Sequence, residues 1–125
     1  MRAVVVERQP EIEIYVRDCP KTQLTAWLVS VIGPLGQPEV AGTSTTYPSA
    51  IGPVVVTSGI EDGPFVSVWF NTPHSPWATD VDCARQAARE LRCAVRCCPG
   101  KCYPKVHLSP EAVLEIEGDS EGLTT

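Results

Sequence analysis

The sequence predicts an α+β fold: an antiparallel meander sheet of about five to seven strands, with one main amphipathic helix (about 80–92) packed on one face. Two observations carry this prediction. In the first half of the chain, apolar and polar residues alternate with a period of two, as in half-buried strands, and glycine–proline clusters separate the alternating runs. After Trp77 the period changes to that of a helix.

Five segments of the first half are predicted as strands. The clearest is 11–16, where isoleucine and valine alternate with polar residues. Segment 25–32 is apolar and rich in β-branched residues, and glycine and proline follow it directly. Segments 54–57 and 64–70 flank an acidic turn that ends in glycine, so we expect them to form a hairpin. The five predicted strands are 11–16, 25–32, 40–47, 54–57 and 64–70.

The predicted helix begins after Thr79, because a hydroxyl side chain followed three residues later by Asp82 has the form of a capping box. Its small and apolar residues fall on one stripe, which would let the helix lie close against a sheet. The stripe consists of Val81, Ala84, Ala88 and Leu91, with Cys83 and Ala87 beside it. The arginines lie toward the C-terminal end of the helix, where the helix dipole favours positive charge.

We expect two further strands, at 94–98 and 113–117, although Ser109-Pro110-Glu111 could equally start a short helix. Residues 1–117 are expected to form one domain. Residues 118–125 have the composition of a flexible acidic tail. No segment has the roughly 18 uncharged apolar residues of a membrane-spanning helix. The first residues also lack the long apolar region of a secretory signal. The expected location is therefore the cytoplasm, with no membrane contact.

Charge is strongly segregated along the chain. The formal net charge is -5, and residues 22–84 contain five acids and no lysine or arginine. Six basic residues then follow within 85–105, and the last twenty residues hold five acids. Such segregation can steer a charged partner. Nucleic acid is not the expected partner, because the chain has no basic excess and its aromatic residues do not interleave with the basic run.

The six cysteines raise the possibility of a metal site. If zinc binds at all, its ligands would be Cys93, Cys97, Cys98 and Cys102. Structural zinc sites favour paired cysteines two residues apart, which this cluster lacks. Neighbouring residues of a strand also point to opposite faces of the sheet. We therefore expect reduced thiols and no cofactor.

No catalytic motif is recognisable, and the chain is expected not to be an enzyme. A cysteine nucleophile such as Cys19 would need a histidine base, and only His74 and His107 are present. The Gly-x-Ser-x-Gly sequence of serine hydrolases does not occur. Two alternatives to a protein-binding domain stay open: a small enzyme or ligand-binding domain using the sheet–helix crevice, and a zinc-stabilised adaptor.

Segment 69–77 combines aromatic residues with prolines. Trp69, His74 and Trp77 are candidates for a partner-binding surface, since tryptophan anchors many interfaces. The two tryptophans are equally suited to covering the core between helix and sheet, because large aromatic residues dominate core burial.

The order of a strand over 65–70, a capped helix, a strand over 95–98 and a closing strand over 113–117 resembles small acidic α+β immunity proteins of bacterial polymorphic toxin systems. The resemblance covers the second half of the chain and lies in layout and acidity. It implies a non-enzymatic inhibitor that blocks the active site of a basic toxin domain. Acidic strands or loops would then face the toxin, where charge complementarity speeds association. The partner-binding candidates on this basis are Glu61, Asp62, Glu115 and Glu117.

Overall fold

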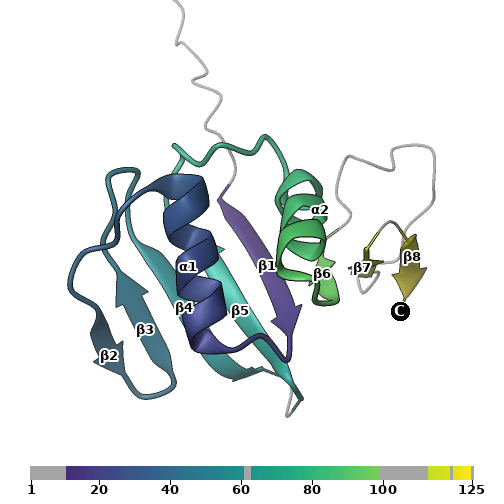
Figure 1. Ribbon diagram of the computed structural model, residues 1–125, viewed down its shortest axis with the longest axis horizontal. Helices are drawn as coiled ribbons and strands as arrows, with labels where there is room; N and C mark the ends of the chain where they lie inside the picture. The colour runs from purple at the N-terminus through teal and green to yellow at the C-terminus, as the bar shows by residue number, and fades with distance from the viewer. Residues whose placement is uncertain (1–10, 61–62, 99–112, 119, 125) are drawn as a thin grey trace, which may run out of the picture.

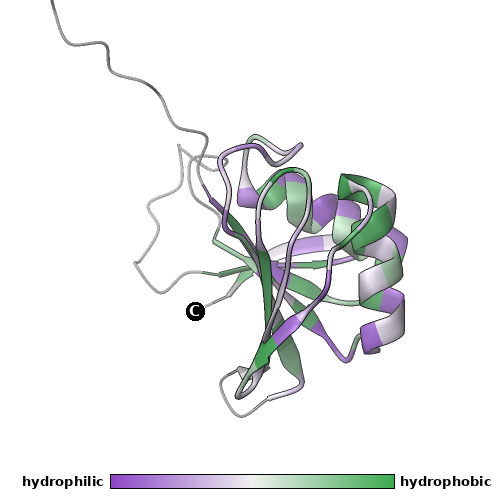
Figure 2. Cartoon of the chain, turned by 90° about the vertical axis from the view of Figure 1, so that its left-hand side faces the viewer, coloured by the Kyte–Doolittle hydropathy of each residue, from purple (hydrophilic) through white to green (hydrophobic). Residues whose placement is uncertain are grey.

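The structure of the protein is a computed structural model, and it describes residues 11–60, 63–98, 113–118 and 120–124. These residues form two layers, a single twisted sheet and two helices that both cover the same face of it (Figures 1 and 2). The α+β class is therefore confirmed. The elements are β1 (Ile12–Arg17), α1 (Lys21–Ile32), β2 (Glu39–Ala41), β3 (Ser44–Tyr47), β4 (Val54–Ile60), β5 (Phe65–Phe70), α2 (Asp80–Leu91), β6 (Val95–Cys97), β7 (Val113–Glu117) and β8 (Ser120–Thr124).

The sheet has eight strands in the order β2-β3-β4-β5-β1-β6-β7-β8, and every neighbouring pair is antiparallel. The predicted number of strands, five to seven, is thus slightly too low. The meander is also interrupted, because β1 lies between β5 and β6. Helix α2 carries the chain from β5 across β1 to β6, which forms a split β-α-β unit. The first strand of the chain is therefore central in the sheet.

The core lies between the sheet and the two helices. In β1, Ile12, Ile14 and Val16 are fully buried, and they point toward the helix layer together with Val68 of β5 and Val95 of β6. Apolar residues on every second position of β1 thus fill the core, as the alternation of 11–16 predicts. The other set of side chains on these strands points away from the helices.

Helix α1 corrects the prediction of a strand at 25–32. Four buried side chains, Leu24, Trp27, Leu28 and Ile32, recur at helical spacing and face the sheet. This stripe is hidden in the sequence because apolar residues also occupy the other side, where Val29 is 46% exposed. The β-branched content favours a strand locally, but packing of the stripe decides the conformation. The predicted stop is correct, since the helix ends at Gly33, whose φ is 91°.

Two strand boundaries also differ from the prediction. Segment 40–47 is not one strand, because Gly42, with a φ of 62°, turns the chain between β2 and β3. Segment 118–125 was expected to be a tail, but Ser120–Thr124 pairs with β7 as strand β8. These residues form a strand because the chain turns at Gly118 and runs back along the edge of β7, where their backbone groups can pair.

The expected helix is confirmed as α2. Thr79 is its N-cap and accepts a hydrogen bond from the Asp82 backbone N–H at 3.1 Å. All six residues of the predicted stripe are buried. The helix ends when Arg92 adopts the left-handed conformation, with a φ of 56°. The predicted strands at 11–16, 94–98 and 113–117 are confirmed as β1, β6 and β7, and the predicted hairpin as β4–β5.

Candidate functional site

Both helices lie on one side of the sheet, and the other side is here called the open face (Figure 2). The open face gathers aromatic and charged side chains from strands far apart in the sequence. The antiparallel registers identify its members, because directly paired residues point to the same side. Its principal side chains are Glu13, Tyr15, Arg17, Val55, Phe65, Ser67, Trp69, Arg96, Glu115 and Glu117.

Trp69 is a half-buried aromatic side chain on this face and is flanked by two carboxylates. Its indole Nε1 donates a hydrogen bond to Glu11 Oε2 at 3.1 Å, and its strand partner is Glu13. Glu13 accepts a hydrogen bond of 2.7 Å from the Ser67 hydroxyl. These bonds orient both carboxylates around the tryptophan without neutralising either one.

Arg96 organises the centre of the open face. Its Nε lies 2.6 Å from Glu115 Oε1, and its guanidinium stacks over the ring of Phe65 at 4.4 Å from the ring centroid. Tyr15 pairs with Arg96 on its other side. The two arginines of this face each have an acidic neighbour, since Arg17 lies 3.6 Å from Asp18. The arginine charges are thus offset, and Glu11, Glu13 and Glu117 leave the face acidic.

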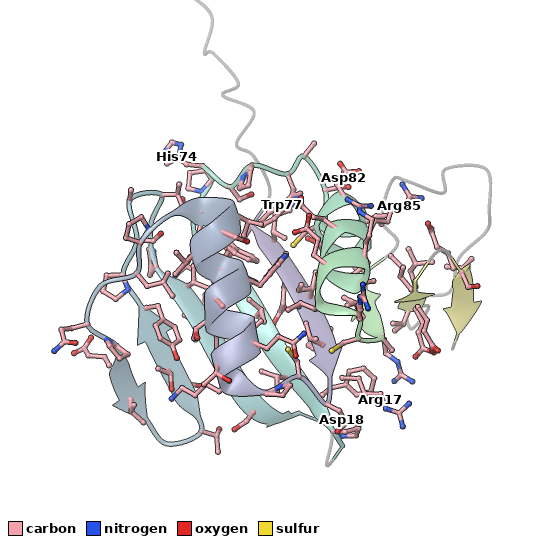
Figure 3. All side chains as sticks on the ribbon, in the orientation of Figure 1. Arg17, Asp18, His74, Trp77, Asp82 and Arg85 are labelled. Carbon is pink, nitrogen blue, oxygen red and sulfur yellow. The ribbon has the colours of Figure 1, made fainter. Side chains whose placement is uncertain are left out.

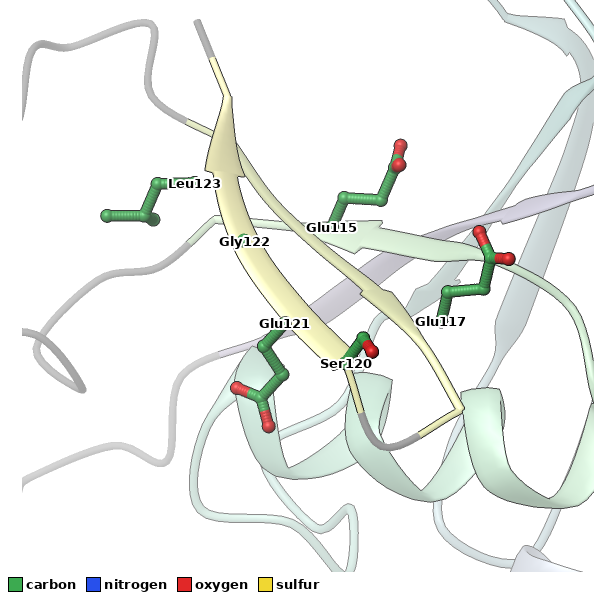
Figure 4. Close-up of a pocket in the computed structure, with 6 residues that line it drawn as sticks. All are labelled: Glu115, Glu117, Ser120, Glu121, Gly122 and Leu123. Carbon is green, nitrogen blue, oxygen red and sulfur yellow. The ribbon is translucent and has the colours of Figure 1, made fainter.

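An acidic hollow of about 430 Å³ lies over β7 and β8. Glu115 and Glu117 project from β7 on the open-face side, whereas Glu121 of β8 projects toward the helix layer (Figure 4). Glu121 is held there by Arg85 of α2, with Arg85 Nε 2.8 Å from Oε2. Gly122 lies opposite Glu115 and adds no side chain, which keeps the hollow open. A long cationic side chain would fit such a hollow and meet carboxylates there.

The structure brings together three of the predicted partner-binding residues. Trp69, Glu115 and Glu117 share the open face. Glu61 and Asp62 lie outside the described residues. The remaining candidates, His74 and Trp77, belong to the loop between β5 and α2.

Trp77 is a core residue, which corrects its assignment to a binding surface. It is 6% exposed, stacks on Trp27 with centroids 5.9 Å apart, and contacts Phe70 edge-on at 5.0 Å. The alternative role of covering the core is therefore correct for Trp77. His74 is exposed, but it follows the Phe70 end of β5 and lies away from the strands that carry Glu115 and Glu117 (Figure 3).

His74 and Cys19 lie at opposite ends of the sheet. Phe70 pairs with Ile12 at one end of β1, and Arg17 pairs with Phe65 at the other. Figure 3 shows His74 near the first end, while Arg17 and Asp18, which precede Cys19, mark the second. Burial, and next the neighbouring Cys93 thiol, raise the pKa of Cys19 to about 12, which keeps its thiol protonated near neutral pH. His74 and Cys19 therefore do not form a nucleophile–base pair, and His107 lies outside the described residues.

The cysteines named as zinc ligands do not converge in the part of the chain that the structure describes. Cys97 is 1% exposed in the core, Cys98 is exposed, and Cys93 lies beside Cys19. Burial raises the pKa of Cys83 well above its ordinary value, and its neighbours Asp80 and Cys97 add to the effect. No group of three or more metal-ligating side chains occurs among the described residues. Cys102 lies outside them.

Asp80, the first residue of α2, has a structural partner. Its Oδ1 accepts a hydrogen bond of 3.3 Å from the Glu13 backbone N–H, which ties the start of the helix to β1. Burial raises the pKa of the Asp80 carboxyl, while this hydrogen bond lowers it and the Glu13 charge raises it again. Asp80 and Thr79 thus anchor the helix end without a ligand.

Sequence reasoning missed Glu13, Tyr15, Phe65 and Arg96 as members of the site. The alternation of 11–16 places Glu13 and Tyr15 on one side of a strand, and that signal was present in the sequence. Which side stays uncovered depends on where the helices pack. Arg96 becomes central only because β6 lies beside β1.

A second concavity, here called the crevice, lies on the helix side of the sheet, between α1 and strands β3 to β5. Its volume is about 230 Å³. The crevice lies between helix and sheet, which is where the alternative prediction of a ligand-binding domain places its site. Its lining residues are Cys19, Lys21, Leu24, Gly42, Thr43, Thr45, Tyr47, Val56, Ser58 and Val66.

Among the described residues, no helix has both the length and the apolar character needed to cross a membrane. Comparison with known proteins yields no match: no family model, no curated protein and no solved structure matches this chain.

Proposed function

We propose that this chain is a non-enzymatic protein-binding domain whose open face docks onto a basic surface of another protein. The observation that carries the proposal is the gathering of Trp69 and several carboxylates on the sheet face opposite α1 and α2. Tryptophan contributes strongly to binding energy where it is desolvated at the centre of an interface. Carboxylates around it select a partner rich in arginine or lysine.

The arrangement also disfavours other classes of partner. A nucleic acid would bring phosphates against Glu13, Glu115 and Glu117, and the like charges would repel it. A face made of several neighbouring strands suits the broad contact of a protein surface better than it suits a small substrate. The acidic hollow over β7 and β8 would receive one long basic side chain of the partner.

The finer proposal is an immunity-type inhibitor that neutralises a cognate bacterial toxin in the cytoplasm by blocking its active site. It rests on the resemblance to small acidic immunity proteins and on the acidity of the open face. A toxin that cleaves nucleic acid needs a basic cleft for its substrate, so an acidic face is the complementary surface for such a cleft.

The docking face can be mapped by titrating isotope-labelled protein with an oligoarginine peptide and following its amide and indole NMR signals. We expect shifts at the Trp69 indole N–H and at residues of β1, β6 and β7 that face the same side. Glu117→Arg should weaken the interaction several-fold at low salt, and added salt should weaken it further.

Asp82→Arg is the matched control, because it makes the same charge change at an exposed position of α2, on the side of the sheet opposite the open face. It should leave the affinity for the peptide nearly unchanged. Equal weakening by both variants would mean that only overall charge attracts the peptide. Shifts confined to α1 and α2 would place the binding surface on the helix layer and remove the open face from the proposal.

The partner itself is sought by affinity purification from the source cells with three baits: the unmodified protein, Trp69→Ala and Asp82→Arg. A protein retained by the first and third baits and lost with Trp69→Ala supports the proposal. A toxin domain with a basic cleft would support its finer form. A protein that all three baits retain equally would contradict docking through the open face.

A further inference from the structure

The crevice has an apolar floor and lies on the opposite side of the sheet from the open face. Val56 of β4 and Val66 of β5 point toward the helix layer and are only partly buried. Leu24 of α1 faces them from above. These side chains offer an apolar surface to a small molecule that enters between helix and sheet.

The polar side chains of the crevice can all donate hydrogen bonds. Lys21 supplies a positive charge, and Thr45 and Tyr47 supply hydroxyls. Among the residues that the structure describes, no aspartate or glutamate lines the crevice. The Cys19 thiol also lines the crevice, and burial raises its pKa, so it stays neutral near neutral pH. The lining therefore favours a ligand that carries negative charge and accepts hydrogen bonds.

Tyr47 gives independent support for a ligand. The residue is only 5% exposed and lines the crevice, yet none of the described residues hydrogen-bonds to its hydroxyl. Across the described chain, no fully enclosed polar side-chain atom lacks a partner. The Tyr47 oxygen is therefore not fully enclosed, and because the residue lines the crevice, we infer that a molecule bound there can accept its hydrogen bond.

The end of α1 at this crevice is also suited to an anion. The N-cap position is Pro20, which provides no side-chain hydrogen bond, and the first turn contains no acidic residue. The positive end of the helix dipole is thus uncompensated beside Lys21. Helix α2 differs, because Thr79 caps its start and Asp80 and Asp82 lie in its first turn.

We propose that the crevice is a binding site for a small organic carboxylate with a short apolar body. Lys21 offsets the charge of the carboxylate, the Tyr47 hydroxyl donates to it, and the apolar body lies on Leu24, Val56 and Val66. A cavity of about 230 Å³ limits the ligand to a small molecule. This site is independent of the protein-binding proposal, because the two surfaces lie on opposite sides of the sheet.

The test uses three probes of equal chain length, hexanoate, 1-hexanol and hexylamine, each titrated into isotope-labelled protein. Hexanoate is expected to shift the signals of residues around the crevice, with a dissociation constant on the order of 1 mM. The neutral alcohol should bind more weakly and the cationic amine weakest of all. Lys21→Gln and Tyr47→Phe should each weaken hexanoate binding by about fivefold.

Arg89→Gln and Tyr15→Phe are the matched controls, because Arg89 lies on α2 and Tyr15 on the open face. Both should bind hexanoate as the unmodified protein does. The proposal is overturned if hexylamine binds as tightly as hexanoate, or if neither crevice variant changes the affinity. It is also overturned if hexanoate shifts no crevice signal at concentrations well above the expected dissociation constant.

Discussion

At the scale of single residues, a chain of side-chain hydrogen bonds joins the two helices. Trp27 Nε1 donates to Glu90 Oε1 at 2.9 Å, and Trp77 Nε1 donates to Gln86 Oε1 at 2.8 Å. The Gln86 amide donates in turn to Glu90 at 3.3 Å. Both indole N–H groups belong to buried rings, so each needs an acceptor that the helix surface provides.

Removing the acceptor of Trp27 should destabilise the protein. Glu90→Ala leaves a nearly buried N–H without its partner, and we expect the free energy of unfolding to fall by about 1–3 kcal/mol. Urea unfolding followed by tryptophan fluorescence measures the change. Glu39→Ala, at an exposed position of β2, should change stability by less than about 0.5 kcal/mol. If both variants unfold at the same urea concentration, the hydrogen-bonded chain does not contribute to stability.

At the scale of elements, α2 packs across the junction between β1 and the strands that follow it in the sheet, β6 and β7. It contacts β1, β6 and β7, and its small side chains let it lie close to them. Ala84 and Ala87 are fully buried, and Ala88 is 1% exposed. The opposite side of the helix carries the charged and polar side chains, and this division gives the helix its strongly amphipathic character.

A charge on the buried stripe of α2 should therefore be poorly tolerated. Ala88→Glu would bury a carboxylate with no cation to pair with it, and we expect a loss of about 3–5 kcal/mol in the free energy of unfolding. Arg89→Glu places the same side chain at the next, exposed position and should cost no more than about 1 kcal/mol. Thermal unfolding of the two variants compares them directly. Similar melting temperatures would show that the buried face of α2 is assigned wrongly.

At the scale of the whole molecule, the packing of the helices on the sheet gives the described cysteine thiols different exposures to solvent. Cys19, Cys83 and Cys97 are buried between the layers, Cys93 is half-buried, and Cys98 is exposed. Burial also raises the pKa of Cys19 and of Cys83, so few thiolates form at these positions near neutral pH. Reaction of a buried thiol thus requires opening of the layers.

Alkylation with iodoacetamide near pH 8, read by mass spectrometry of the peptides, should follow this order. Among the five cysteines that the structure describes, Cys98 should react first. Cys83 and Cys97 should react at least about a hundredfold more slowly, because they react only when the fold opens. Adding denaturant should equalise the rates. Rapid labelling of Cys83 or Cys97 in the folded protein would contradict the close packing of α2 on β6.

Part of the candidate site could be predicted from local pattern. Trp69, Glu115 and Glu117 were identified as partner-binding residues, and they lie on one face. Trp77 was misplaced because the same aromatic content suits a surface and a core. Its burial depends on Trp27, which belongs to a segment predicted as a strand and found as a helix. One wrong element thus hid the partner that decides the role of Trp77.

The sequence by itself determined the elements whose period is unambiguous, namely β1, the β4–β5 hairpin, α2 and β7, because alternation and helical stripes are local properties of the chain. The α+β class followed from them. Only the tertiary structure decided that β1 lies between β5 and β6, that 25–32 is helical, and that Ser120–Thr124 forms the edge strand beside β7. The open face and the crevice are consequences of that arrangement, since each is formed by residues far apart in the chain that meet only when both helices pack on the same side of the sheet.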